Sequence, residues 1–86
     1  MTTKYIWEGC IGISIQPRHN SKTGEQFFSY RFHRFGGEDI NGQRKYYDSF
    51  SPRDNENLGK ALSRAMQFMQ NTLPAALADD SMQLAA

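Results

Sequence analysis

The side chains of this sequence that are best suited to bind a ligand are arginine, histidine and tyrosine, and several occur at two-residue intervals. Arg31 and His33 are two positions apart, and so are Arg44 and Tyr46. A guanidinium forks onto phosphates or guanine edges, an imidazole can donate to a base, and an aromatic ring can rest on a sugar. With two cations from a preceding turn region, the candidate binding residues are Arg18, Lys22, Arg31, His33, Arg44 and Tyr46.

The same sequence offers little for catalysis or for metal binding. His19, His33 and the single cysteine Cys10 cannot supply a four-ligand zinc site of the usual spacing. No glycine loop with dinucleotide or P-loop spacing precedes a helix. Cys10 and His33 could pair as nucleophile and base, but we favour the interpretation of a small buried thiol and a surface histidine. We therefore expect no enzyme activity, no metal and no cofactor.

The charge balance limits how such a binding site could work. The chain has 10 Lys+Arg against 9 Asp+Glu and a formal charge of +1, whereas a nucleic-acid binder that acts through charge alone is strongly basic. Residues 1–53 hold eight bases and five acids, a balance of +3, and residues 54–86 hold two bases and four acids, a balance of −2. The cations therefore belong to the half of the chain in which we expect strands.

The sequence also indicates a compartment. With Cys10 as the only cysteine, no intramolecular disulfide can form, which fits a reducing environment. The first ten residues lack the apolar run of a signal peptide, and no segment approaches the ~20 apolar residues of a membrane span. We expect a soluble, cytoplasmic protein with no membrane contact.

Two segments alternate in the way that is typical of strands with one buried face. In 10–16, isoleucines alternate with small and polar residues. In 26–35, we expect Phe28, Tyr30 and Phe32 to face a helix. The opposite, exposed face would carry Ser14 and Gln16 from the first segment and Phe27, Ser29, Arg31, His33 and Phe35 from the second.

A third strand is predicted over 44–50, and alternation alone leaves its facing ambiguous. A bulge near Asp48 would let Tyr47 and Phe50 both face inward and leave Arg44 and Tyr46 outside. We favour this arrangement because Phe50 stands directly before the expected helix and should pack under it.

The other residues of the N-terminal half connect or flank these strands. Turn formers in 17–25 and the pair Asn41-Gly42 in 36–43 predict two hairpins. Trp7 lies among the mixed polar and aromatic residues 1–9, which could add to the core or form an edge. We interpret its ring as a lid on one end of the core, with a role in contacts as the alternative.

Residues 51–70 predict one amphipathic helix. Ser51 can cap the first turn, Pro52 suits the first helical position, and Asp54 completes a capping-box spacing. Apolar residues recur at three- and four-residue steps, with Phe68 at the margin of the stripe. The stripe consists of Leu58, Ala61, Leu62, Ala65, Met66 and Met69. Such a helix buries too little alone, so it must pack on the sheet.

These elements together predict an α+β fold of the order β-β-β-α. It is a three-stranded antiparallel meander with one amphipathic C-terminal helix packed on one face. Asn71 and Pro74 end the helix. Residues 1–74 would then form a single domain and residues 75–86 a flexible tail, with one more helical turn or docking on a partner as alternatives for the tail.

A resemblance to known families lies in four stretches: GISI (12–15), YRFHR (30–34), RKYYDSF (44–50) and NLGKALSRAMQF (57–68). They resemble the ethylene-response-factor type of DNA-binding domain and are similar to the three-stranded arm-binding domains of phage tyrosine-recombinase integrases. The resemblance implies that Arg31, His33, Arg44 and Tyr46 face DNA and that Arg18 and Lys22 lie in a phosphate-contacting hairpin. Because no recombinase catalytic domain follows, it implies a free-standing module, such as a small phage or mobile-element regulator.

Two functions fit these expectations. The first is a DNA-binding module that reads double-stranded DNA with the exposed face of its sheet. The second is a small protein-binding inhibitor or adaptor of the phage type, which presents the same aromatic and cationic face to an acidic protein surface. Since arginine and tyrosine are enriched at both kinds of interface, the residue types alone do not separate the two.

Overall fold

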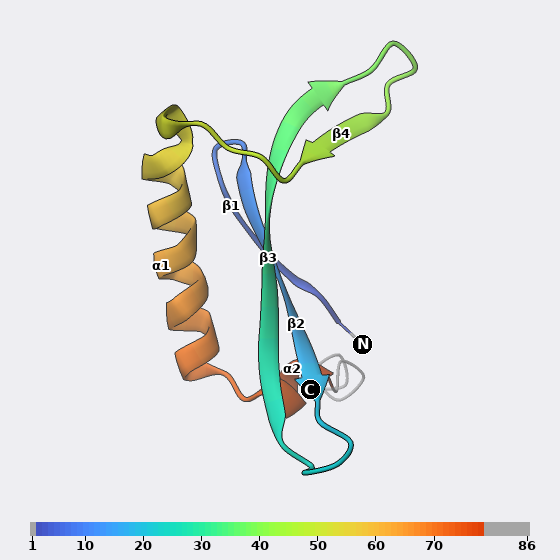
Figure 1. The fold of residues 1–86 in the computed structure, drawn as a ribbon, viewed down its shortest axis with the longest axis vertical. Helices are drawn as coiled ribbons and strands as arrows, with labels where there is room; N and C mark the ends of the chain where they lie inside the picture. Colours follow the sequence, from blue (N-terminus) through green and yellow to red (C-terminus); the bar gives the residue numbers. More distant parts are fainter. Residues whose placement is uncertain (1, 79–86) are drawn as a thin grey trace.

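The computed structural model describes residues 2–78 as one antiparallel sheet with a long helix across one face (Figure 1). The sheet has four strands in the order β1-β2-β3-β4. The elements are β1 (Lys4–Glu8), β2 (Ile11–His19), β3 (Gln26–Glu38), β4 (Arg44–Tyr47), a 3₁₀ turn (Pro52–Asp54), α1 (Asn55–Asn71) and α2 (Pro74–Ala78). The α+β class and the helix on one face are confirmed. The predicted number of strands is one too few, because residues 4–8 also form a strand.

The additional strand, β1, is an edge strand that pairs with β2. Ile6 lies opposite Ile13, and Trp7 lies opposite Gly12. The side chain of Ile6 is buried among the core residues, while Tyr5 and Trp7 are exposed. Five alternating residues therefore suffice for a strand here, since Ile6 extends the row of isoleucines that β2 supplies.

The pairing of β2 with β3 follows the predicted faces. Ile13 lies opposite Phe32, and Ser14 lies opposite Arg31, so aliphatic and polar positions stay on separate sides. The turn between them is closed by Asn20, whose side-chain oxygen accepts hydrogen bonds from the backbone N–H groups of Lys22 and Thr23. The first predicted hairpin is confirmed.

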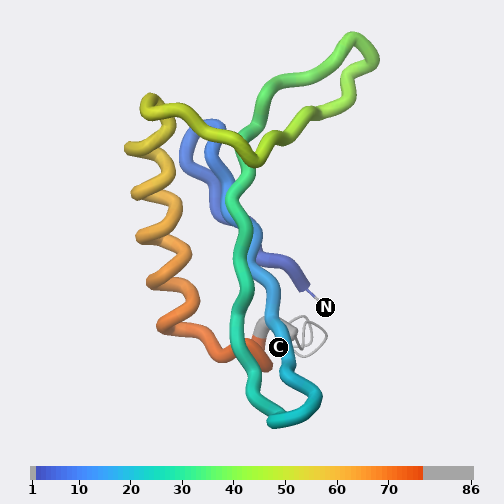
Figure 2. The backbone as a smooth tube through the Cα atoms, in the orientation of Figure 1, coloured from blue at the N-terminus to red at the C-terminus, as the bar shows by residue number. Residues whose placement is uncertain are grey.

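The pairing of β3 with β4 is interrupted by a bulge, which lies in β3 and not near Asp48. The register shifts between Phe35 and Glu38, where the two glycines Gly36 and Gly37 stand. The ring of Tyr47 lies so close to Gly36 that a Cβ atom there would come within 2.1 Å of it. Beyond the bulge, the β3–β4 hairpin leans away from α1 (Figures 1 and 2).

The second hairpin turn has the chemistry that Asn41-Gly42 predicts. The carboxylate of Asp39 accepts hydrogen bonds from the backbone N–H groups of Asn41 and Gln43, each at 2.9 Å. Gly42 has a φ of 78°, a conformation that glycine adopts without strain. The turn is thereby held by one aspartate and one glycine.

The helix begins where the capping residues predict. The Asp54 carboxylate accepts a hydrogen bond from the Ser51 backbone N–H at 2.9 Å, and Asp54 is buried. A 3₁₀ turn, Pro52–Asp54, leads into α1, which ends at Asn71. Pro74 then starts α2, which lies against β2 and β3. The predicted tail thus opens with one more short helix, and residues 79–86 lie outside the described residues.

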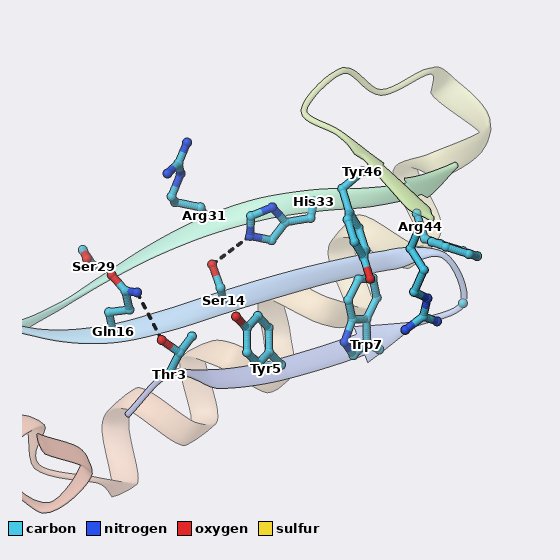
Figure 3. Close-up of a pocket in the computed structure, with 12 residues that line it drawn as sticks. Thr3, Tyr5, Trp7, Ser14, Gln16, Ser29, Arg31, His33, Arg44 and Tyr46 are labelled. Carbon is cyan, nitrogen blue, oxygen red and sulfur yellow. Dashed lines mark hydrogen bonds between the residues drawn. The ribbon is translucent and has the colours of Figure 1, made fainter. Parts of the chain in front are cut away.

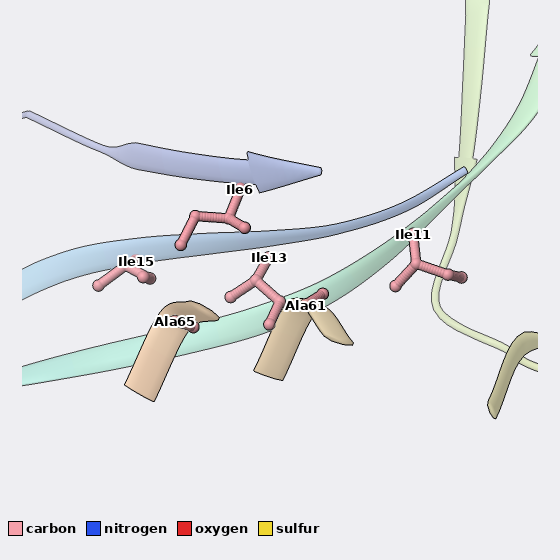
Figure 4. Close-up of a cluster of buried hydrophobic side chains, with 6 residues drawn as sticks. All are labelled: Ile6, Ile11, Ile13, Ile15, Ala61 and Ala65. Atoms are coloured by element: carbon pink, nitrogen blue, oxygen red, sulfur yellow. The ribbon is translucent and has the colours of Figure 1, made fainter. Parts of the chain in front are cut away.

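The core is a layer of aliphatic side chains between α1 and the first two strands (Figure 4). Its buried residues are Ile6, Ile11, Ile13, Ile15, Ala61 and Ala65. Phe50 packs beside this cluster, as predicted. The predicted apolar stripe is wrong at one position. Phe68 packs on Phe28 with 5.9 Å between the ring centroids, whereas Met66 is 47% exposed, because α1 lies mainly over β1 and β2 and turns Met66 away from them.

Candidate nucleic-acid interface

The face of the sheet turned away from α1, here called the outer face, is hollowed into a groove of about 780 Å³. All four strands contribute to its walls (Figure 3). The groove is lined by Thr3, Tyr5, Trp7, Gly9, Ser14, Gln16, Ser29, Arg31, His33, Phe35, Arg44 and Tyr46. The β3–β4 hairpin forms one side, since the double-glycine bulge turns it toward the outer face.

One end of the groove is a cluster of three aromatic rings and one guanidinium. The rings of Trp7 and Tyr46 lie 6.1 Å apart, and those of Tyr46 and Phe35 lie 5.8 Å apart, between centroids. The guanidinium of Arg44 lies 4.9 Å from the centroid of the Phe35 ring, within the range of a cation–π contact. The cluster is held in place by its own members, yet Trp7 and Tyr46 stay 39% and 48% exposed.

The position of Trp7 corrects the expectation that its ring closes one end of the core. The ring lies on the outer face, directly over Gly12, where a Cβ atom would come within 2.6 Å of it. Glycine is the residue that lets a large ring lie flat on a strand. The ring of Trp7 is therefore part of the outer face and stays partly exposed there.

The middle of the groove is polar. The Ser14 hydroxyl and the His33 Nε2 are hydrogen-bonded at 2.8 Å, and the Gln16 amide donates to the Thr3 hydroxyl at 3.1 Å (Figure 3). The first pair joins β2 to β3, and the second joins β2 to the residue that directly precedes β1. Donors and acceptors are therefore presented in fixed positions beside the aromatic cluster.

Two arginines on the outer face differ in how they are held. Arg18 donates to the Ser29 hydroxyl and to the Gln16 side-chain oxygen, each at 2.9 Å. Arg31 lines the groove and is exposed, and within residues 2–78 it makes no hydrogen bond or ion pair. Arg31 is thus the cation of the groove that is most available to a ligand.

The groove has an electropositive lining. It contains two arginines and one histidine and no aspartate or glutamate. The nearest acidic residue of β1, Glu8, is engaged by Arg64 of the helix instead. A ligand in the groove would meet cations without a competing carboxylate, which favours an anion.

The predicted site residues are brought together in part. Arg31, His33, Arg44 and Tyr46 line the groove, and Arg18 lies on the same face next to it. Lys22 is exposed in the β2–β3 turn and does not line the groove. The prediction missed Tyr5 and Trp7 of β1 and Thr3, which directly precedes this strand.

The described residues give the alternative chemistries little support. Cys10 packs against the aliphatic core while His33 is bonded to Ser14 on the outer face, so the two do not form a nucleophile–base pair. Within residues 2–78, no three His, Cys, Asp or Glu side chains are grouped to hold a metal ion. No helix in this part of the chain has the length and apolar character to cross a membrane.

No protein-family model, curated protein or solved structure matches this chain. The resemblance to ethylene-response-factor and integrase arm-binding domains therefore stays a prediction. The geometry of the groove is the basis for interpreting its function.

Proposed function

We propose that this protein is a non-enzymatic nucleic-acid-binding module that holds its ligand in the groove of the outer face. The observation that carries the proposal is the composition of the lining, in which four aromatic rings and two arginines occur with no carboxylate. The arginines are suited to bind phosphates, and the aromatic rings are suited to stack on the flat faces of bases. A regulator carried by a phage or mobile element is the setting that the resemblance implies.

The shape of the outer face favours a single strand over a duplex. A sheet that reads double-stranded DNA must project into the major groove. Here the reading face is recessed, and the β3–β4 hairpin rises beside it. A single strand can lie along such a groove with its bases stacked on aromatic side chains and its backbone beside cations.

The arrangement of the lining suggests separate roles for its two parts. Trp7 and Tyr46 offer exposed ring surface at one end and are suited to stack on bases. Arg31 stands on β3 among the polar side chains and is suited to a phosphate. Ser14 and His33 lie between them and can bond to base edges or to the sugar–phosphate backbone.

The proposal is tested by titrating labelled oligonucleotides of about 10 nucleotides, a length within the usual site size of one binding fold. Single-stranded DNA, single-stranded RNA and duplex DNA are compared at two salt concentrations. Because Trp7 is the only tryptophan and lies in the groove, its fluorescence reports binding directly. We expect single strands to quench it and to bind more tightly than the duplex.

A matched pair of tyrosines separates the groove from the rest of the surface. Tyr46 lies in the groove and is 48% exposed, and Tyr30 lies on the opposite face and is 46% exposed. We expect Tyr46→Ala to weaken binding of the short oligonucleotide by about 1–3 kcal/mol, the value of one stacked base. Tyr30→Ala should leave this binding unchanged. Equal losses in both variants would place the site elsewhere.

Two further outcomes would change the proposal. Tighter binding of the duplex would mean that the ligand is double-stranded DNA, as the sequence predicts. Absence of binding by every nucleic acid at micromolar protein and low salt would end the nucleic-acid assignment.

A protein partner is the second candidate, and one observation favours it. Ile40, at the tip of the β3–β4 hairpin, is 99% exposed and follows Glu38 and Asp39. An apolar side chain with acidic neighbours suits a protein surface better than a polyanion. Binding that depends on Ile40 and not on Tyr46 would select this candidate.

A further inference from the structure

The side chains of the outer face are ordered in rows that run across β1, β2 and β3. In one row, Tyr5 of β1 lies opposite Ser14 of β2, and Ser14 lies opposite Arg31 of β3 (Figure 3). Because neighbouring strands lie about 4.8 Å apart, this row spans about 10 Å between the backbones of β1 and β3. It presents an aromatic ring, a hydroxyl group and a guanidinium, in that order, across the groove.

The next row along the strands repeats part of this order. Trp7 lies opposite Gly12, and Gly12 lies opposite His33, so a ring on β1 is again combined with a nitrogen-bearing side chain on β3. The two rows are about 7 Å apart, which is the length of two residues in a strand. This spacing is about twice the rise per nucleotide of a stacked helix. Successive nucleotides therefore fit successive rows when their bases are unstacked from each other and rest on protein rings.

Both ends of the first row are free to bind. The Tyr5 ring is 58% exposed, and its side chain makes no hydrogen bond or ring contact within residues 2–78. Arg31 is also exposed and unpaired in this part of the chain. A base can stack on the ring, and a phosphate can accept hydrogen bonds from the guanidinium. Because the sugar of a nucleotide connects its base to its phosphate, the sugar then lies over β2, at Ser14.

The hydroxyl of Ser14 is suited to a sugar that carries a hydroxyl of its own. It is bonded to the His33 Nε2 at 2.8 Å, and a serine hydroxyl has one O–H donor and two acceptor lone pairs. Whichever group donates in this bond, at least one lone pair of Ser14 is left. The 2′-hydroxyl of ribose can donate to it, since this group is both donor and acceptor. The deoxyribose of DNA has only C–H bonds at the same position.

The burial of Ser14 makes this difference count. Ser14 is 9% exposed and lies on the floor of the groove, so a sugar above it removes its remaining contact with water. A polar atom that loses water without gaining a partner costs free energy. Ribose supplies the partner, whereas deoxyribose and phosphate have no O–H to donate.

We propose that the groove selects single-stranded RNA over single-stranded DNA, a specificity that rests on the nucleic-acid binding proposed above. The bases lie on the rings of β1, the phosphates lie along β3 beside Arg31, and a ribose 2′-hydroxyl donates to the Ser14 hydroxyl. The observation that carries this assignment is the single row of Tyr5, Ser14 and Arg31, with a ring, a hydroxyl and a free guanidinium on successive strands.

The test uses oligonucleotides of about 10 nucleotides that share one sequence of adenine and cytosine and differ only at the 2′ position. RNA, DNA and 2′-fluoro RNA are titrated against the wild type, with the fluorescence of Trp7 as the readout. The 2′-fluoro group keeps the sugar conformation of RNA but has no O–H to donate. We expect RNA to bind about 3- to 10-fold more tightly than either of the other two, which is the contribution of one hydrogen bond.

Variants of the row locate the contact. Ser14→Ala should lower the ratio of RNA affinity to DNA affinity to about one, because the acceptor of the 2′-hydroxyl is lost. The matched control is Ser63→Ala, which removes an exposed serine hydroxyl from α1 and should keep the wild-type ratio. Tyr5→Ala removes a stacking surface that accepts either sugar, so the affinities for RNA and for DNA should both fall about fivefold or more.

Each contrary outcome has a separate meaning. Equal or tighter binding of DNA by the wild type would overturn the selection of RNA and leave the nucleic-acid groove in place. So would 2′-fluoro RNA that binds as tightly as RNA, because sugar conformation would then cause the preference, and this comparison decides alone should Ser14→Ala fail to fold. An unchanged ratio in a folded Ser14→Ala, or unchanged affinities in Tyr5→Ala, would contradict the row. Absence of binding by all three oligonucleotides would end the proposed function itself.

Discussion

The two faces of one sheet have opposite chemistry in this protein, although the same strands build both. On β2, Ile11, Ile13 and Ile15 are completely buried on the inner side, and Ser14 and Gln16 point into the groove. On β1, Ile6 is buried and Trp7 is exposed. The isoleucines stabilise the fold, and most of the aromatic side chains are left for surfaces. Aromatic residues in a strand therefore need not indicate a core.

The sharpest test of this comparison uses two neighbouring residues of β2. Ile13→Ala removes a fully buried side chain from the inner face and should lower the free energy of unfolding by about 2–5 kcal/mol. Ser14→Ala, one position along, removes a single hydrogen bond to His33 and should cost about 0.5–1.5 kcal/mol. Urea unfolding measures both. Equal losses would mean that the outer face contributes as much stability as the core.

A smaller effect is expected where Trp7 crosses β2. Gly12→Ala adds a Cβ atom that would come within 2.6 Å of the Trp7 ring. The ring must move or the strand must shift, and such overpacking costs about 1–3 kcal/mol. Fluorescence of Trp7 in the native state should change together with the unfolding midpoint. A variant with unaltered fluorescence and stability would show that the ring does not lie on Gly12.

The anchoring of the helix over the inner face can be tested at its first turn. Asp54→Ala removes the carboxylate that accepts the Ser51 backbone N–H, and should cost about 0.5–2 kcal/mol. Ser51→Ala should cost less, because the hydrogen bond from the Ser51 hydroxyl to the same carboxylate is long, at 3.4 Å. The unfolding free energies of the two variants show which substitution is more destabilising. A larger loss in Ser51→Ala would mean that Ser51, and not Asp54, makes the main capping interaction.

The smallest effect on stability is expected at Arg31. Its side chain is exposed and makes no hydrogen bond or ion pair within residues 2–78, so Arg31→Ala should change the unfolding free energy by less than about 0.5 kcal/mol. The same change should weaken binding of a single strand and reduce the slope of log affinity against log salt by about 0.7. Lys60→Ala, on the helix, serves as the control for a lost surface charge. A slope that is unaltered in Arg31→Ala would remove this residue from the site.

The division of the two faces was predictable because it depends on alternation alone. The isoleucines of β2 and the split of β3 between Phe32 inside and His33 outside follow from a period of two. Arg31 and His33 were placed on the outer surface by the same rule, whereas Arg44 and Tyr46 were placed there from the expected packing of Phe50 under the helix. The helix was predictable because its cap and its apolar period agree.

The failures come from contacts between distant residues. Trp7 lies on the outer face because Gly12 makes room for it, and this pairing depends on the register of β1. The alternation of Tyr5, Ile6 and Trp7 was a usable signal for the missing strand. Met66 was predicted to be packed and is exposed, whereas Phe68 was placed at the margin and is packed. The rotation of α1 about its axis depends on where the helix lies on the sheet, which its own sequence does not specify.

The bulge was assigned to the wrong strand for a similar reason. The double glycine of β3 was interpreted as part of a turn, yet Gly36 is where the ring of Tyr47 needs space. Alternation in 44–50 could not show this, because Gly36, which makes room for the Tyr47 ring, lies on the partner strand.

Arg64 has a consequence for the behaviour of this protein at high concentration. Its guanidinium donates to the carbonyl oxygen of Trp7 at 3.0 Å and also engages Glu8, both on the edge strand β1. An open edge is a template on which a foreign strand can add, and repeated addition is how sheets grow into aggregates. With the guanidinium on the Trp7 carbonyl, an incoming strand must first displace a charged group. This contact from one residue of the helix therefore opposes the addition of a strand at the Trp7 end of β1.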